Sequence, residues 1–249
     1  MTPKAPPSAD PVIWHDVECA AYSADLELWR ELAGAAGGPV LDLGCGTGRV
    51  ALDLAAQGHD VTALDSDPEL VRALAARARE AGLRVRTEVA DARSFSLGRE
   101  FALAIAPMQV VQLLGGTPGR LRMLGCLREH LRPGAVFAAA LADPFEGVPA
   151  EESAPPMPDV REQDGWIFSS VPLAVRAEPG ATAIDRLRQT VSPEGRLEEA
   201  VTSISLDDAR PEELEHLGAS MRLRTLPRRV VPPTGDYVGS TVVMLERLP

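Results

Sequence analysis

One short segment, VLDLGCGTGRV at residues 40–50, restricts the possible folds of this chain more than any other feature. It joins a short apolar run at residues 39–43 to a helix-like stretch at residues 49–57. An apolar run of this length predicts a strand buried on both faces, which is the environment of a parallel sheet. The alternating glycines between them permit positive φ angles and the close approach of a ligand to the backbone. We therefore predict an open α/β sheet whose ligand lies beyond the carboxyl ends of its strands.

The order of the other predicted elements supports a parallel sheet. Strands alternate with helices up to residue 141, which predicts helices on both faces and right-handed crossover connections. A single helix is predicted over residues 14–36, before the first strand. The first five strands are predicted at residues 39–43, 60–64, 84–90, 101–106 and 135–141.

The pattern changes after residue 144. Residues 146–164 are rich in proline and acidic side chains, which predicts a loop or lid. Three antiparallel strands follow, separated by turn sequences that contain proline and glycine, and the chain ends with a short helix and a strand pair at residues 221–231 and 241–248. We predict one domain with four parts: a flexible arm (1–13), a core that binds a cofactor (14–143), a lid with an antiparallel insertion on the substrate side (144–210), and the C-terminal helix and strand pair (211–249).

The spacing of the glycines distinguishes between types of nucleotide site. A dinucleotide site requires GxGxxG, and its third glycine would fall on Arg49, which is large and charged. A phosphate-binding P-loop requires Gly-Lys-Ser or Gly-Lys-Thr, which this segment lacks. The observed spacing is GxGxG, preceded by Asp42.

Through this segment the chain resembles the class I S-adenosylmethionine-dependent methyltransferases, whose first motif is a strand, an acid and glycines that alternate with small residues. Asp42 and residues 44–48 match that motif without a gap. The resemblance implies a Rossmann-like α/β fold: a mostly parallel seven-stranded sheet with helices on both faces and an antiparallel last strand. In this chain a β-rich insertion would precede the C-terminal strand pair. The implied cofactor is S-adenosyl-L-methionine, with S-adenosyl-L-homocysteine as the product.

Further cofactor contacts are expected at the ends of the next strands. Asp65 ends the second strand, where a carboxylate can accept both hydroxyls of a ribose. The resemblance implies that Asp91 receives the adenine amino group and that Ala92 contacts the adenine ring. It also implies that the N-terminal helix covers the cofactor, with Tyr22 or Trp14 near the methionine end. A helix cap is the alternative for Asp65, and a turn residue is the alternative for Asp91. The predicted cofactor residues are Tyr22, Asp42, Gly44, Cys45, Gly46, Gly48, Asp65, Ser66, Asp91, Ala92, Ala106 and Met108.

The methyl acceptor is less well defined by the sequence. Methyltransferases that act on adenine or glutamine amino groups usually carry Asn/Asp-Pro-Pro-aromatic after the fourth strand, whereas residues 106–109 read Ala-Pro-Met-Gln. Ala106 also leaves empty one acidic position of the metal-dependent catechol enzymes, so no metal is predicted. His15, Gln109 and Gln112 are candidate substrate contacts, with ordinary surface polarity as the alternative. His130 and His216 are predicted on exposed helix faces, and no catalytic base is identified.

Composition restricts the possible partners. The formal net charge of −11 disfavours a nucleic-acid surface. No apolar stretch is long enough to span a bilayer, and the polar N-terminus is not a secretory signal. Three cysteines are too few for a disulfide framework, so a cytoplasmic location is expected. The leading hypothesis is a methyltransferase for a small organic acceptor at O, N or C. A protein or RNA methyltransferase and a non-catalytic cofactor-binding protein are the alternatives, and the oligomeric state is open.

Overall fold

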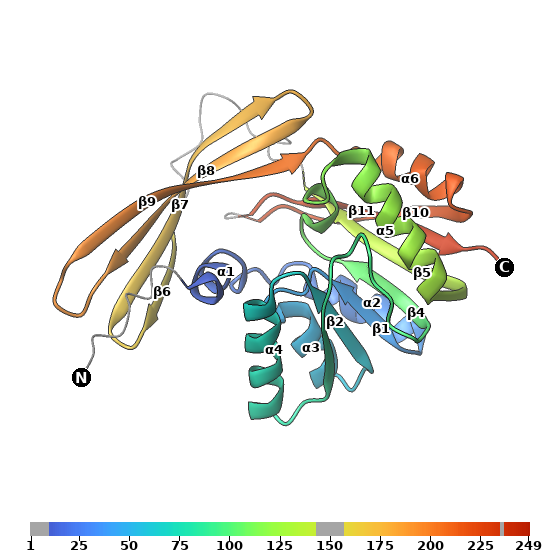
Figure 1. Ribbon diagram of the computed structural model, residues 1–249, viewed down its shortest axis with the longest axis horizontal. Coiled ribbons are helices and arrows are strands. Elements are labelled where there is room, and N and C mark those ends of the chain that lie inside the picture. The colour runs from blue at the N-terminus through green and yellow to red at the C-terminus, as the bar shows by residue number, and fades with distance from the viewer. Residues whose placement is uncertain (1–9, 143–156, 235–236) are drawn as a thin grey trace.

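A computed structural model describes residues 10–142, 157–234 and 237–249, which form two β-sheets and their covering helices (Figure 1). Most of the predicted arm and the predicted lid residues 144–156 lie outside the described residues. The elements are α1 (Pro11–Cys19), α2 (Leu26–Ala36), β1 (Val40–Leu43), α3 (Arg49–Ala56), β2 (Val61–Asp65), α4 (Pro68–Glu80), β3 (Val85–Val89), β4 (Phe101–Ala106), η2 (Val110–Gln112), α5 (Gly116–His130), β5 (Leu131–Leu141), β6 (Asp159–Gln163), β7 (Trp166–Glu178), β8 (Ala181–Val191), β9 (Leu197–Asp207), α6 (Pro211–Ser220), β10 (Leu223–Val231) and β11 (Ser240–Arg247).

The larger sheet has seven strands in the order β10-β11-β5-β4-β1-β2-β3. Strands β1 to β5 pair in parallel with one another, and β11 runs antiparallel between β5 and β10. All four residues of β1 are buried, because β1 lies inside the sheet and is covered on both faces. The predicted fold class is therefore confirmed, including the antiparallel last strand.

Helices cover both faces of this sheet (Figure 1). On one face, α5 and α6 pack through apolar residues such as Leu124 and Leu214 onto alternate strand residues that include Leu41. On the other face, Trp29 of α2 and Leu54 of α3 pack with the intervening strand residues. Alternate burial follows from the two-residue repeat of a strand. No helix in the described ranges is both long and apolar enough to cross a membrane.

The smaller sheet is antiparallel, in the order β6-β7-β8-β9. The three predicted strands of the insertion are present, but the prediction that residues 159–163 are loop is wrong, because β6 pairs with β7 there. Asp164 and Gly165 form the two-residue turn between them, with φ of 53° and 80°. Positive φ at both positions is characteristic of the tight turns that Asp-Gly favours.

The predicted single helix over residues 14–36 is also wrong, because the chain turns between α1 and α2. Arg49, the first residue of α3, donates to the backbone oxygen of Tyr22 at 2.9 Å and to both carboxylate oxygens of Asp25 at 2.6 and 2.8 Å. Asp25 also accepts a 2.8 Å hydrogen bond from the Trp29 indole. These contacts with α3 fix the turn, and helical periodicity within the segment does not reveal them.

His130 is buried rather than exposed, so that prediction is wrong as well. Its Nε2 accepts a 3.0 Å hydrogen bond from the amide of Leu97, and its Nδ1 lies 2.7 Å from the backbone oxygen of Cys126. The imidazole thereby joins the last turn of α5 to the loop before β4. His216, by contrast, is exposed on α6 as predicted.

Candidate active site

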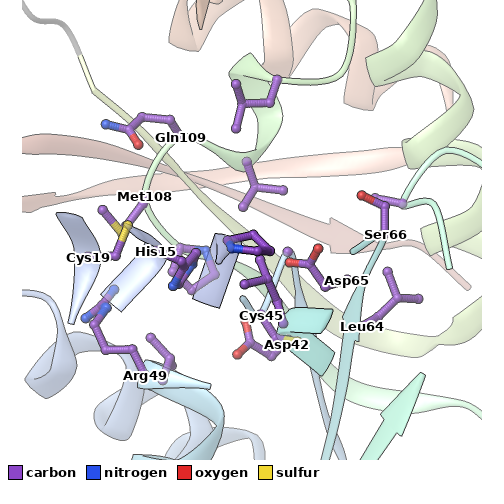
Figure 2. A pocket seen from close by; sticks show the side chains of 18 of the residues that line it. His15, Cys19, Asp42, Cys45, Arg49, Leu64, Asp65, Ser66, Met108 and Gln109 are labelled. Atoms are coloured by element: carbon purple, nitrogen blue, oxygen red, sulfur yellow. The ribbon is translucent and has the colours of Figure 1, made fainter. Parts of the chain in front are cut away.

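A pocket of about 480 Å³ lies at the carboxyl ends of the central strands. Its lining comes from the loops after β1, β2, β3 and β4, from α1, and from β8 and β9 of the smaller sheet. Figure 2 shows Asp42 and Asp65 at the ends of β1 and β2, together with His15 and Cys19 of α1. The pocket is thus a space between the larger sheet and the insertion, at the place where open α/β sheets bind ligands.

Neighbouring side chains of the protein require glycine at two positions of the glycine loop. Gly46 has a φ of +53°, and a Cβ there would lie 2.1 Å from Nε2 of His15. Gly48 has a φ of +98°, and a Cβ there would lie 2.1 Å from a methyl carbon of Leu74. Larger side chains are therefore excluded by backbone conformation and by these neighbours.

Asp42 ends up almost fully buried beneath the glycine loop, with 1% of its surface exposed. Neither carboxylate oxygen has a hydrogen-bond partner within the described part of the chain. Burial raises the pKa of this carboxyl to about 8. A buried acid without a partner is costly unless a ligand pairs with it. The site therefore suits a ligand that brings a cation to Asp42, such as the ammonium of a methionine moiety.

Asp65 lies at the end of β2 and lines the same pocket. One of its oxygens accepts a 2.9 Å hydrogen bond from the amide of Gly46, and the other accepts a 3.0 Å bond from the amide of Asp67. Each oxygen retains an unused lone pair, because an ionised carboxylate can accept about four hydrogen bonds. Asp67, not Asp65, caps α4 by accepting from the amide of Glu69 at 2.8 Å. Asp65 is therefore not the cap of α4, because Asp67 has that role.

Asp91 and Ala92 line the pocket after β3. Arg93 donates to both oxygens of Asp91, at 2.6 Å from Nη2 to Oδ2 and 2.9 Å from Nε to Oδ1. The pKa of Asp91 is lowered to about 2, chiefly by these side-chain hydrogen bonds. Asp91 is therefore a carboxylate held in place by Arg93, which is suitable for accepting a hydrogen bond from an amino group.

The segment after β4 contributes a strained residue. Met108 lines the pocket with a φ of +57°, in the left-handed region that residues with a side chain rarely adopt. Gln109 also lines the pocket. Gln112 does not: its side chain is buried and exchanges two 3.0 Å hydrogen bonds with the backbone of Ala142. This pairing gives Gln112 a structural role at the end of β5.

His15 of α1 lies against the glycine loop. Its Nδ1 is 3.2 Å from Oγ1 of Thr47, and the Thr47 hydroxyl donates to Asp16 at 2.8 Å. Arg77 of α4 donates to both oxygens of Asp16, at 2.9 and 2.5 Å. Burial lowers the pKa of His15, partly offset by the negative charges of Asp16 and Asp65. The lowered pKa favours the neutral form of the ring.

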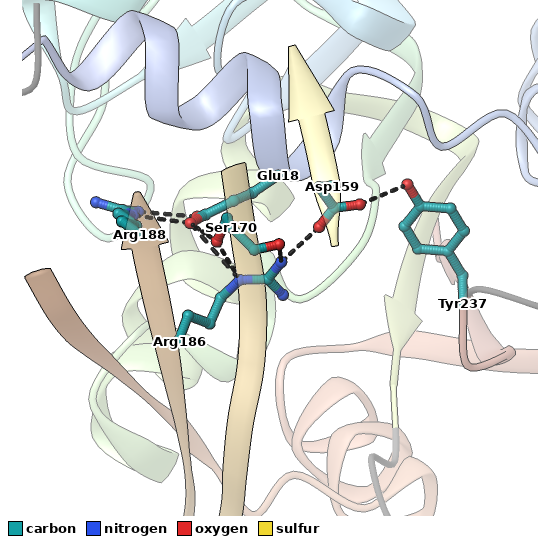
Figure 3. A network of polar contacts seen from close by, with 6 residues as sticks. All are labelled: Glu18, Asp159, Ser170, Arg186, Arg188 and Tyr237. Atoms are coloured by element: carbon teal, nitrogen blue, oxygen red, sulfur yellow. Dashed lines mark hydrogen bonds and ion pairs between the residues drawn. The ribbon is translucent and has the colours of Figure 1, made fainter. Parts of the chain in front are cut away.

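Glu18 and Arg188 close the pocket on the side of the smaller sheet (Figure 3). Arg188 donates to both oxygens of Glu18 at 2.8 Å, and Ser170 donates to one of them at 2.8 Å. Arg188 also lies over the Trp14 ring, 5.0 Å from its centroid. Arg186 extends the network by bonding to Asp159. Glu18, Arg186 and Arg188 were not predicted as site residues, because charged side chains on a helix or a long strand are typical of a solvated face until the smaller sheet packs on α1.

The predicted site residues separate into two groups. Those that line the pocket are Asp42, Gly44, Cys45, Asp65, Ser66, Asp91, Ala92, Met108, His15 and Gln109. Those that the structure places behind the lining are Tyr22, Gly46, Gly48, Ala106 and Gln112. Tyr22 packs on Tyr237, with ring centroids 5.0 Å apart, and beneath the Arg49 guanidinium. Across the described ranges, no group of three or more His, Cys, Asp or Glu side chains gathers in a way that would hold a metal ion.

Comparison with known proteins agrees with this geometry. Residues 40–134 match a family model described as a methyltransferase domain. The matched residues run from β1 into β5 and include the glycine loop and the ends of β1 to β4. The methyltransferase fold extends beyond the matched residues. The sugar N-methyltransferase KedS8 from Streptoalloteichus sp. ATCC 53650 has a similar structure, with a TM-score of 0.74 at 16% identity over 95% of this chain and 92% of that chain.

Two other relatives illustrate the range of similarity. CalS10, an amino pentose methyltransferase from Micromonospora echinaspora whose structure contains S-adenosylmethionine, gives a TM-score of 0.68 at 20% identity, over 93% of this chain and 96% of that chain. A protein of Parasynechococcus marenigrum (strain WH8102), described as an uncharacterized RNA methyltransferase, is 34% identical over 101 residues, which are 36% of this chain and 22% of that protein. The chain spans less than a third of the length of the curated relatives that it matches.

Proposed function

We propose that this protein is an S-adenosylmethionine-dependent methyltransferase that acts on a small organic acceptor. The observation that carries the proposal is one continuous pocket with two chemically different sides. One side presents the acids at the ends of β1, β2 and β3, and the other presents α1 and the smaller sheet. A transferase needs such an arrangement, because donor and acceptor must meet in one space.

The acidic side suits the cofactor. Asp42 would pair with the ammonium of the methionine moiety, Asp65 would accept the ribose hydroxyls, and Asp91 with Ala92 would bind adenine. When bound, S-adenosylmethionine supplies a methyl group that its sulfonium charge activates for displacement. The chain's own contribution is to bind the cofactor, orient the acceptor and exclude water.

The other side suits a small acceptor. Trp14, Met108 and Ile204 provide apolar lining, while Glu18 and Arg188 provide charges that can orient a polar group. The structural relatives KedS8 and CalS10 are described as a sugar N-methyltransferase and an amino pentose methyltransferase, which favours an amine or hydroxyl of a sugar-sized molecule. The net charge of −11 weighs against the RNA acceptor that the short curated match suggests.

The proposal is tested in two steps. Calorimetry should show that the folded protein binds S-adenosylmethionine and S-adenosylhomocysteine. A screen with isotope-labelled methyl donor should then detect transfer to a member of a panel of amino sugars, aliphatic amines and phenols. A folded protein that binds neither form of the cofactor would contradict the proposal at its first step.

A further inference from the structure

A hydrogen-bond chain on α1 fixes which nitrogen of His15 carries the proton. The Thr47 hydroxyl has one hydrogen, and it donates that hydrogen to Asp16. Hydrogen bonds from Arg77 and Thr47 outweigh the effect of burial and lower the pKa of Asp16, so Asp16 is an ionised acceptor. The contact between Thr47 Oγ1 and His15 Nδ1 therefore requires Nδ1 to donate. Nε2 of the neutral ring is left with a free lone pair.

That nitrogen lies against the glycine loop, on a residue that lines the pocket. Nε2 is 2.1 Å from the point where a Cβ of Gly46 would stand. His15 lines the pocket, and Figure 2 shows it on the same side as Cys19 and Met108. No residue in the described ranges forms a hydrogen bond with Nε2. Nε2 is thus a base without a hydrogen-bond partner in the described ranges, on the wall of the pocket that donor and acceptor would share.

The other acidic and thiol groups that line the pocket are less suited to accept a proton from the acceptor. Glu18 is held by Arg188 and Ser170, and Asp91 is held by Arg93. Burial raises the pKa of the Cys19 thiol to about 11 and raises that of the Cys45 thiol further. Asp42 and Asp65 lie on the cofactor side.

Building on the proposed function, we propose that His15 is the general base of the methyl transfer. The acceptor's N–H or O–H gives its proton to Nε2, the acceptor's heteroatom keeps the electron pair of that bond, and the neutral imidazole becomes an imidazolium that later releases the proton to solvent. Thr47 and Asp16 act as positioning residues, because they hold the Nδ1–H tautomer and orient the ring. The charged groups that face His15 are Asp16 and Glu18 of α1, Asp65 of β2 and Arg77 of α4.

The first test needs neither cofactor nor acceptor. Nitrogen-detected NMR of the free protein should show His15 neutral at pH 7, protonated at Nδ1 and unprotonated at Nε2. Thr47→Val should abolish this tautomer preference, and Thr47→Ser, which keeps the hydroxyl, should retain it. A ring protonated at Nε2 in the wild-type protein at pH 7 would overturn the proposal.

The second test uses an acceptor from the screen. His15→Asn keeps a donor near the position of Nδ1 but has no base at Nε2. It should bind S-adenosylmethionine as the wild type does and should lose kcat by about 10²–10⁴-fold. The wild-type rate should fall as the pH drops through the pKa of His15, and the variant should lack that limb. Full activity of His15→Asn would refute the general-base role of His15 and leave the proposed methyltransferase function intact. If the wild-type protein did not bind the cofactor, the proposed function itself would be refuted. If the panel yields no acceptor, the NMR result decides.

Discussion

At the scale of single residues, Asp42 is the most informative side chain of the site. Evolved proteins seldom bury a carboxyl without a partner, because the desolvation is not recovered. Asp42 has a pKa of about 8 and has no hydrogen-bond partner among the described residues. The free energy spent on desolvating the Asp42 carboxyl would be recovered when a cationic ligand binds next to it. The acid before the glycines is then part of the binding chemistry and not only part of the loop.

Cofactor binding should release a proton from Asp42. At pH 7 a carboxyl with a pKa of about 8 is mostly protonated, and a nearby cation favours its ionised form. Titration calorimetry in phosphate and in Tris at pH 7 should therefore give different apparent enthalpies, consistent with release of up to about one proton. Asp42→Asn should abolish the buffer dependence and weaken binding. Equal enthalpies in the two buffers for the wild-type protein would contradict this assignment.

Asp42 should also make the free protein less stable at high pH. Burial on folding raises its pKa from the ordinary 3.8 to about 8. The unfolded state therefore loses this proton first, and the stability linked to the protonated carboxyl declines as the pH rises from about 4 to about 8. Urea denaturation should show that Asp42→Asn gains stability relative to wild type between pH 5 and pH 8. A difference that is constant across this range would speak against a raised pKa.

The ribose assignment of Asp65 can be separated from its local structural role. Asp65→Ala should raise the cofactor Kd, since each hydrogen bond to a charged group contributes about 1.5–3 kcal/mol. Asp67→Ala is the matched control: it removes the cap of α4 and should cost about 0.5–2 kcal/mol of stability with little change in Kd. Calorimetry and urea denaturation measure the two effects. Equal loss of affinity in both variants would show that Asp65 acts only through the fold of the loop.

At the scale of elements, the sequence predicted what local patterns encode. The buried run of β1 and the glycine spacing after it indicated both the sheet and the edge of the sheet at which the pocket lies. The break between α1 and α2 was not predictable in this way, because it depends on Arg49, which is 24 residues from Asp25. The turn at Asp164 and Gly165 did carry a local signal, which the prolines before it concealed. The acceptor side was missed because Glu18 and Arg188 meet only after the smaller sheet docks, 170 residues apart in sequence.

The end of α5 provides a test of element packing. His130 accepts from the Leu97 amide and thereby ties α5 to the loop before β4. His130→Ala removes that acceptor and leaves a cavity beside Phe95, whose ring centroid is 4.7 Å from the imidazole. The change should destabilise the protein by about 1–3 kcal/mol for the unpaired amide alone. His216→Ala, on an exposed position of α6, should leave the urea midpoint unchanged. Similar midpoints for the two variants would place His130 outside the packed core.

At the scale of the whole molecule, α1 joins the two sheets. Asp16 and Glu18 are two positions apart, and such residues point to opposite sides of a helix. Asp16 bonds to Thr47 and Arg77 beside the larger sheet, and it also forms a 3.2 Å ion pair with Arg161 of β6 in the smaller sheet. Glu18 bonds to Ser170 and Arg188 of the smaller sheet. The edge-to-face contact between Trp14 and Phe168, with centroids 5.8 Å apart, strengthens the second attachment. A movement of α1 must therefore displace residues on both sides of the pocket.

This connection predicts that the two sides of the pocket are energetically coupled. Binding of S-adenosylhomocysteine to the larger sheet should hold α1 in place and thus slow hydrogen exchange in β7 and β8, which contain no predicted cofactor residue. Coupling of about 1–3 kcal/mol would correspond to roughly 5–150-fold slower exchange. Glu18→Gln should weaken this protection while leaving the slowing around Asp65 intact.

The control for that variant is Glu178→Gln, which changes an exposed ion pair with Arg176 on the same sheet. It should preserve the protection of β7 and β8, because exposed pairs contribute at most about 1 kcal/mol and this one does not touch α1. Hydrogen-exchange mass spectrometry resolves these segments in all three proteins. If β7 and β8 exchange at the same rate with and without S-adenosylhomocysteine, while the glycine loop is protected, α1 does not transmit cofactor binding and the two sides of the pocket act independently.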